Sequence, residues 1–174
     1  MSVLASGTDY VDLVLERLAK CHREIAGIEV VWKTPPSIAT MMTDLPCVYF
    51  LVGGLLDSVP SQRSGTVTFS RQYTARLLLT TFGVADADND DGAIANQLAI
   101  PFYSRFASYY LAHPKFHTDG VHEDALEELS GMSNEIIFTD SGLVPRRGPG
   151  GTEFAAIDFT LQISMKMHVD TLLF

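Results

Sequence analysis

The sequence predicts an α+β fold: a mainly antiparallel sheet with two long strands, flanked by an N-terminal amphipathic helix and a second, central helix. The prediction depends on two segments, residues 66–82 and 152–169, in which apolar and polar side chains alternate. Alternation with a period of two is typical of a strand with one buried and one wet face. Strands that follow one another with helices between them are typical of α+β proteins.

The final segment, 152–169, is the element around which we expect the sheet to form. From residue 155 onward its odd-numbered residues are apolar and its even-numbered residues are mostly polar. A usual strand has about 5–6 residues, so we expect this one either to continue past the edge of the sheet or to bend at a bulge. The segment 66–82 has a similar length, and we predict that the two strands lie side by side and antiparallel.

The composition indicates one folded domain, residues 1–174. Hydrophobic residues make up 47% and charged residues 19% of the chain, which excludes wholesale disorder. The net charge of −9 repels phosphate backbones, so we expect no specific nucleic-acid binding. The longest apolar run, 47–56, is too short for a bilayer span, and residues 1–10 lack a signal-peptide pattern. Cys21 and Cys47 lie in apolar contexts and are predicted to be buried thiols.

The first helix is predicted to begin at the capping residues Ser6 and Thr8 and to end at Gly27. Residues at helical spacing define its apolar face: Val11, Val14, Leu15, Leu18, His22 and Ile25. We interpret His22 on this face as a hydrogen-bonded packing residue rather than a general base.

Two strands are expected between the first helix and the first long strand. Residues 28–32 form a short strand, and residues 47–52 form a nearly continuously apolar strand that we expect to be central. Between them, Pro35 and Pro36 exclude regular structure. Residues 53–64 have the composition of a loop.

The second helix follows an acidic turn at residues 86–92. Pro101 lies within this helix and is expected to kink it or to divide it, and His113 and Pro114 close it. One broad apolar face is expected to be buried: Ile94, Leu98, Phe102, Phe106, Tyr109 and Tyr110.

The second half of the chain ends in a predicted hairpin. Residues 118–131 fit either a loop or a short helix, and residues 135–139 are predicted to be a strand. Residues 140–151, DSGLVPRRGPGG, are rich in glycine and proline and are predicted to be a hairpin tip that leads into the final strand.

The sequence contains no arrangement typical of a catalytic site, so we expect no enzyme activity, no catalytic residues and no cofactor. There is no phosphate-binding glycine loop, no cysteine–histidine set with zinc spacing and no nucleophile elbow. His113, His117 and His122 are close in sequence, but Pro114 and Gly120 break the helical spacing of a metal site. We interpret these histidines as loop residues.

The acidic turn resembles the start of a calcium loop, because Asp86, Asp88 and Asp90 occupy its positions 1, 3 and 5. The match then fails: position 6 is Asp91 instead of glycine, and position 12 is Gln97 instead of glutamate. Two interpretations stay open, a solvated turn whose carboxylates favour the start of the next helix and a weak site for a divalent cation.

Arg146 and Arg147 are the only adjacent arginines in the chain. They are either a solvated tip or, together with Asp140 and Leu143, an interface that docks onto an acidic neighbour. The second interpretation follows from the preference for arginine at protein interfaces.

Two segments of the sequence carry motifs that occur together in one known family. One is the second helix and its exit, AIANQLAIPFYSRFASYYLAHPKF, which contains an aromatic–Leu–Ala–x–Pro turn at residues 110–114. The other is IIFTDSGLVPRRGPGGTEFAAIDFTLQISMKM, which contains an Asp-Ser-Gly hairpin at residues 140–142 before the final strand. Together the two segments resemble the tail terminator, or tail completion, proteins of long-tailed bacteriophages. The similarity spans about two thirds of the chain, and its motifs are structural rather than catalytic.

The resemblance implies an α+β subunit that assembles with itself into a ring, usually of six copies. Such a ring caps the tail tube, stops its polymerisation and presents a surface to the head connector. The expected partners are therefore other copies of this chain, the tail tube protein and the head connector or completion protein. The expected location is the virion and, during assembly, the host cytoplasm. An overlong strand agrees with this, because its free edge can pair with another subunit.

Other functions stay open at this point. A head-completion or connector ring of the phage neck has the same features. A cytosolic ligand-binding domain is a second class, with a pocket lined by Phe102, Phe106 and Tyr109, although these side chains also suit a helix core. An enzyme is a third class, and no motif favours it.

Overall fold

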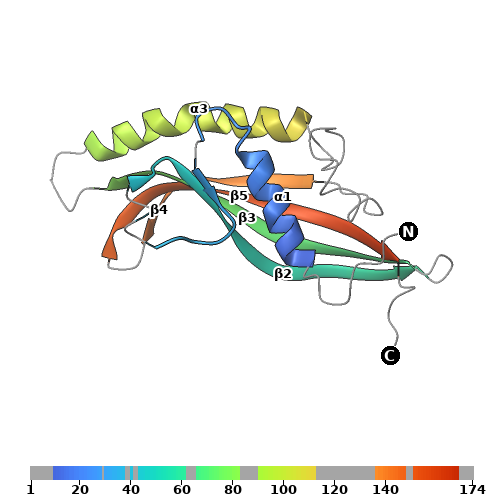
Figure 1. Ribbon diagram of the computed structural model, residues 1–174. Helices are drawn as coiled ribbons and strands as arrows, with labels where there is room; N and C mark the ends of the chain where they lie inside the picture. Colours follow the sequence, from blue (N-terminus) through green and yellow to red (C-terminus); the bar gives the residue numbers. More distant parts are fainter. Residues whose placement is uncertain are drawn as a thin grey trace.

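The computed structural model describes residues 10–28, 30–37, 40, 43–61, 66–82, 90–112, 136–147 and 151–168. Within these ranges, two helices lie on one face of a five-stranded sheet with the strand order β1-β2-β3-β5-β4 (Figure 1). This architecture confirms the predicted α+β fold. The elements are α1 (Tyr10–His22), β1 (Val30–Trp32), β2 (Cys47–Ser61), β3 (Thr66–Phe82), α3 (Asp90–Ala112), β4 (Ile136–Arg147) and β5 (Glu153–His168).

The two long strands, β3 and β5, are antiparallel neighbours, as predicted. Their pairing runs from Thr66↔His168 to Phe82↔Glu153, with one register shift in β3. β5 also continues past the end of its other neighbour, because its last pair with β4 is Ile136↔Ile163. At that end β2, β3 and β5 extend beyond both helices (Figure 1). The predicted odd-numbered core face of β5 is confirmed by five side chains that are at most 1% exposed: Ala155, Ile157, Phe159, Leu161 and Ile163.

β2 is longer than predicted, and the loop expected at residues 53–64 is largely strand. It reaches Ser61 by pairing with β3 through two register shifts, one after Val52 and one after Leu55. Gly53 is needed within this irregular stretch, because a Cβ there would lie 2.9 Å from the carbonyl oxygen of Gln72. β2 was predicted to be a central strand, with a neighbour on each side. This holds only for Cys47–Tyr49, the three residues of β2 that pair with β1.

β4 is also longer than predicted, and the hairpin tip expected at residues 140–151 is strand as far as Arg147. A bulge between Asp140 and Leu143 replaces the expected turn, and Gly142 adopts a φ of 67° there, which favours glycine. Pro145 is tolerated because β4 is an edge strand among the described elements, where a missing N–H need not break a ladder hydrogen bond.

α1 forms the predicted amphipathic helix but ends at His22 rather than at Gly27. Tight turns follow it, in which the N–H of Arg23 donates to the carbonyl of Lys20 at 3.3 Å and the N–H of Ile28 donates to that of Ile25 at 3.1 Å. The expected caps at residues 6 and 8 lie outside the described residues.

α3 is one helix of 23 residues that passes through Pro101, so of the two predicted outcomes, a kink or a division, the division is wrong. Pro101 has no N–H to donate to the carbonyl of Gln97, and Gln97 is an exposed residue. The predicted buried face is also partly wrong, because Ile94 is 51% and Leu98 43% exposed. The sheet side of the helix instead carries two alanines that allow a close approach, followed by aromatic residues: Ala95, Ala99, Phe102, Phe106 and Tyr110.

The apolar interior has two parts, one on each face of the sheet. The larger lies between the helices and the sheet, where the ring of Phe106 stacks on Phe159 at 3.9 Å between centroids. The smaller lies on the opposite face and contains Cys47, Tyr49, Leu78, Phe154 and Ala156. This second cluster was not predicted, because its members occupy positions that alternate with the main core. Both cysteines are buried thiols that form no disulfide, as predicted.

Candidate functional site

An ion cluster lies on the sheet face opposite the helices. Asp158 of β5 and Arg76 of β3 are direct register partners, and their positions alternate with residues of the main core. Arg76 donates to both carboxylate oxygens, from Nε at 2.7 Å and from Nη2 at 2.9 Å. Arg146 of β4 donates to the same carboxylate at 2.5 Å. Three adjacent strands are therefore joined by one buried carboxylate that two guanidinium groups share.

The charge state of this cluster follows from its contacts. Burial alone would raise the pKa of Asp158, but the hydrogen bonds from Arg76 and Arg146 outweigh it and lower the pKa below its ordinary value. The hydrogen bond to Asp158 raises the pKa of Arg76. The carboxylate is thus ionised at neutral pH, and the three groups together carry one net positive charge.

The residues predicted to form an interface lie in β4 and are held by contacts within the chain. Asp140 accepts a hydrogen bond from the N–H of Gly142 at 2.9 Å, and Ser141 accepts one from the N–H of Asp158 at 3.0 Å. Leu143 packs against the main core. The Asp-Ser-Gly motif is therefore a bulge that ties β4 to β5, not the hairpin predicted from the sequence.

The two arginines differ in their surroundings. Arg146 has a side chain that is 39% exposed and belongs to the ion cluster. Arg147 is 79% exposed and pairs with Glu153 at 2.9 Å, a contact that contributes little to folding. The sequence identified both arginines but not their partners, because Asp158 occupies a position assigned to the wet face of β5.

A second candidate surface is the free edge of β2, which the sequence did not predict because this stretch has the composition of a loop. Beyond Tyr49 this edge has no neighbouring strand among the described residues. Val52 is 44%, Leu55 52% and Leu56 49% exposed. The pair of leucines directly after two glycines is the only sequence signal that could have indicated it. Exposed apolar side chains along an edge without a neighbouring strand are typical of a site for another chain.

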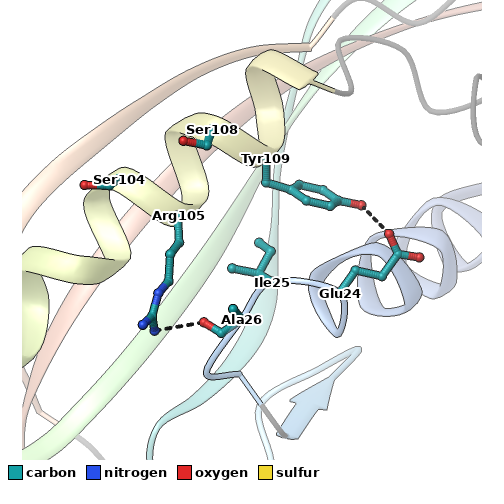
Figure 2. A pocket seen from close by; sticks show the side chains of 7 residues that line it. All are labelled: Glu24, Ile25, Ala26, Ser104, Arg105, Ser108 and Tyr109. Atoms are coloured by element: carbon teal, nitrogen blue, oxygen red, sulfur yellow. Dashed lines mark hydrogen bonds between the residues drawn. The ribbon is translucent and has the colours of Figure 1, made fainter.

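The aromatic pocket considered from the sequence does not form, because Phe102 and Phe106 are buried in the main core. A shallow open groove of about 390 Å³ lies nearby, between α3 and the turn after α1 (Figure 2). Arg105 donates to the carbonyl of Ala26 at 2.9 Å, and the hydroxyl of Tyr109 donates to Glu24 at 3.3 Å, both across this groove.

His22 is a packing residue, as predicted. It is fully buried, its Nδ1–H donates to the carbonyl of Leu18 at 2.7 Å, and its Nε2 accepts from the hydroxyl of Tyr110 at 2.5 Å. Because the carbonyl can only accept, Nδ1 carries a proton, and in the neutral ring that burial favours, Nε2 is free of a proton and accepts from Tyr110. Burial accordingly lowers the pKa of His22 to about 4.

The remaining predicted residues cannot be placed together. Asp86, Asp88 and the histidines at 113, 117 and 122 lie outside the described residues, and Asp90 is the first residue of α3. In the described part of the chain, no three histidine, cysteine or carboxylate side chains are arranged to hold a metal ion. Neither described helix is long and apolar enough to cross a bilayer.

No protein-family model matches the chain, and a search of curated proteins found no match.

Proposed function

We propose that this protein is a structural virion protein of the tail terminator type, which assembles with itself into a ring at the end of a phage tail tube. The ring stops polymerisation of the tube and offers a surface to the head connector. The partners are other copies of the chain, six in the ring by resemblance to the family, together with the tail tube protein and the connector.

The observation that carries this proposal is the free edge of β2. Val52, Leu55 and Leu56 are each about half exposed on the irregular part of β2 beyond Tyr49, which has no outer neighbour among the described residues. Monomeric proteins protect such an edge with charges, prolines or bulges; β2 has two register shifts here, but its first charged residue, Asp57, follows the exposed leucines, and no charge lies between Phe50 and Leu56. An edge of this kind is suited to contact with another subunit.

Two further features support the proposal. The motifs that resemble the terminator family lie at structural positions, residues 110–112 at the end of α3 and residues 140–142 in the bulge of β4. The sheet also has a second edge at β4, so opposite edges of one subunit are available for head-to-tail contacts, which can close into a ring.

The test is assembly of an edge variant. We expect Leu55→Lys/Leu56→Lys to remain monomeric at concentrations where the natural chain forms a ring, because lysines on an edge strand oppose pairing. Sedimentation velocity, with and without tube protein, measures this. Ile94→Lys is the matched control, since Ile94 is 51% exposed on α3 and distant in sequence from the edge.

Two outcomes contradict the proposal. One is a natural chain that stays monomeric at every concentration with and without tube protein. The other is an edge variant that assembles as well as the control. A connector ring of the phage neck is separated from a terminator by electron microscopy of virions labelled on this chain, which places it at the tube end or at the connector.

A further inference from the structure

The free edge of β2 begins with a regular part, residues 50–52, defined here as the open segment of β2. On one side of it β1 ends at Trp32, which pairs with Tyr49, and on the other side the first register shift follows Val52. The three residues between these points pair regularly with β3 and have no outer neighbour among the described strands. The open segment therefore has room for one further short strand.

The irregular stretch that follows the open segment is fixed by the chain itself. Arg71 of β3 donates to the carbonyl of Gly53 at 3.1 Å. The backbone of Gly53 also lies so close to β3 that a Cβ there would be 2.9 Å from the carbonyl oxygen of Gln72. The bulge that presents Leu55 and Leu56 is thus formed before a partner binds, which lowers the entropy cost of docking.

The order of the sheet determines which strand a neighbouring copy brings to this edge. β2 with β3, β3 with β5 and β5 with β4 are three antiparallel pairs, so β4 runs opposite to β2. Both helices lie on one face of the sheet (Figure 1), and the rotation from one subunit to the next in a ring keeps that face on the same side. A neighbour that continues the sheet in this way brings β4 to β2, antiparallel to it.

The register places matching parts of the two edges at the same level. Across the four strands, each residue of the open segment has a level partner in β4: Phe50 with Asp140, Leu51 with Thr139 and Val52 with Phe138. The bulge of β4, between Asp140 and Leu143, is level with Tyr49, where β1 ends. A neighbouring β4 is therefore regular beside the open segment and bends where β1 occupies the edge.

The charges along the two edges agree with this level. Neither residues 50–56 nor residues 136–139 include a charged residue, so these stretches of two acidic copies meet without local repulsion. The nearest charges have opposite signs, since Lys33 directly follows β1 and Asp140 ends the regular part of β4. Both are on the helix side: the Lys33 ammonium binds a carboxylate of α1 at 2.7 Å, and Asp140 is level with Phe159, which stacks under α3. An exposed pair of this kind favours one orientation more than it adds affinity.

We propose that residues 138–140 of one copy pair, antiparallel, with residues 50–52 of the next copy, so that the sheet continues across the subunit boundary. This assignment rests on the ring proposed above and names its contact. Because one copy contributes β2 and the other β4, the contact is heterologous and can repeat around a ring. Leu55 is level with Ile136, so the exposed leucines of β2 meet the apolar start of the neighbouring β4.

Two edge variants test the contact by complementation. Leu55→Lys/Leu56→Lys blocks the β2 edge, and Thr139→Lys/Asp140→Lys changes two exposed residues of β4 and places like charge near Lys33. We expect each variant alone to raise the midpoint concentration of assembly by at least about tenfold. Each keeps the edge that the other has lost, so an equimolar mixture is expected to form a one-to-one dimer and nothing larger. Native mass spectrometry and sedimentation velocity measure these species.

The matched control is Ile94→Lys/Leu98→Lys, which adds two lysines at exposed positions of α3. It is expected to assemble like the natural chain, under the conditions in which the natural chain forms the ring.

A disulfide between copies tests the register without added charge. Leu51→Cys/Thr139→Cys places two thiols at one level of adjacent strands, roughly 4.5–5.5 Å apart at Cβ, and is expected to give cross-linked multimers on mild oxidation. Within one chain β3 and β5 separate these positions by roughly 14 Å, which prevents an internal bond. Leu56→Cys/Thr139→Cys is the control, because its positions are not level. The natural cysteines are buried. Non-reducing electrophoresis measures the products.

The outcomes separate this contact from the ring itself. A natural chain that forms a ring, together with a Thr139→Lys/Asp140→Lys variant that assembles equally well, overturns the pairing and leaves the proposed function standing. The pairing is also overturned by a mixture without a dimer, by a lysine control weakened as much as the edge variants, or by a Leu56 control that cross-links as readily as the level pair. A natural chain that stays monomeric with and without tube protein contradicts both proposals.

Discussion

At the scale of residues, Asp158 connects β3, β4 and β5 through one buried carboxylate. Its side chain is 8% exposed and accepts from Arg76 in a bidentate pair, so removing Arg146 leaves the carboxylate partly compensated. We expect Arg146→Ala to lower the free energy of unfolding by about 1–2 kcal/mol. This loss is smaller than the loss expected from removing a fully buried charged hydrogen bond, because the side chain of Arg146 is 39% exposed. Chemical denaturation measures this.

Arg147→Ala is the matched control for this prediction. Its side chain is 79% exposed and pairs with a partly exposed Glu153, so we expect a change below about 0.5 kcal/mol. Equal losses for the two variants would show that the ion cluster does not contribute to folding more than a surface pair does.

His22 makes stability depend on pH. Its pKa is about 4 in the folded chain, against 6.5 when it is unperturbed, because burial opposes the charged ring. The unfolded chain therefore binds more protons between these values, so the contribution of neutral His22 is complete above about pH 6.5 and is lost as the pH falls towards 4. The difference corresponds to about 3 kcal/mol.

We expect His22→Gln to remove this component of the pH dependence, because glutamine does not titrate. The measurement is the free energy of unfolding of both chains between pH 7 and about pH 4.5, and the difference between them isolates His22 from the carboxylates. The two curves should converge as the pH falls. Parallel curves would contradict the assignment of a neutral, buried His22.

At the scale of elements, the long strands were predictable and the edge strands were not. Both β3 and β5 alternate regularly, and their pairing followed from their similar length. β2 and β4 instead contain glycines and prolines that are typical of loops. They remain strands because bulges absorb the irregular residues and because an edge position tolerates proline. Local composition does not predict which strand will be at the edge of the sheet.

The buried side of α3 illustrates the same limit. The helix has apolar residues on nearly all sides and one charged residue after Ile94, so its pattern alone does not distinguish the sheet side from the outer side. Contact with the sheet decides this, and it selects Ala95 and Ala99 rather than Ile94 and Leu98. For the candidate site, the sequence identified Arg146, whereas its partner Asp158 became evident only from the register of three strands.

At the scale of the whole molecule, the structure separates two kinds of surface through which an acidic chain could assemble. The arginines of β4 are paired with carboxylates of their own chain, whereas the exposed side chains of Val52, Leu55 and Leu56 at the β2 edge are apolar. These two kinds of contact respond to salt in opposite ways. Added salt screens contacts between opposite charges and weakens them. It also screens the repulsion between two copies that each carry a net charge of −9, so association through apolar contacts becomes stronger.

We therefore expect self-association to strengthen when salt is raised from about 20 mM to about 300 mM, because the Debye length falls from roughly 20 Å to below 8 Å while apolar contacts persist. Sedimentation velocity across this range measures the midpoint concentration of assembly. Arg146→Ala and Leu55→Lys/Leu56→Lys provide the comparison: the first should keep the salt response of the natural chain, and the second should abolish ring formation at every salt concentration. Association that weakens steadily with salt would instead assign the subunit contact to arginines that exchange their internal carboxylates for those of a neighbouring copy.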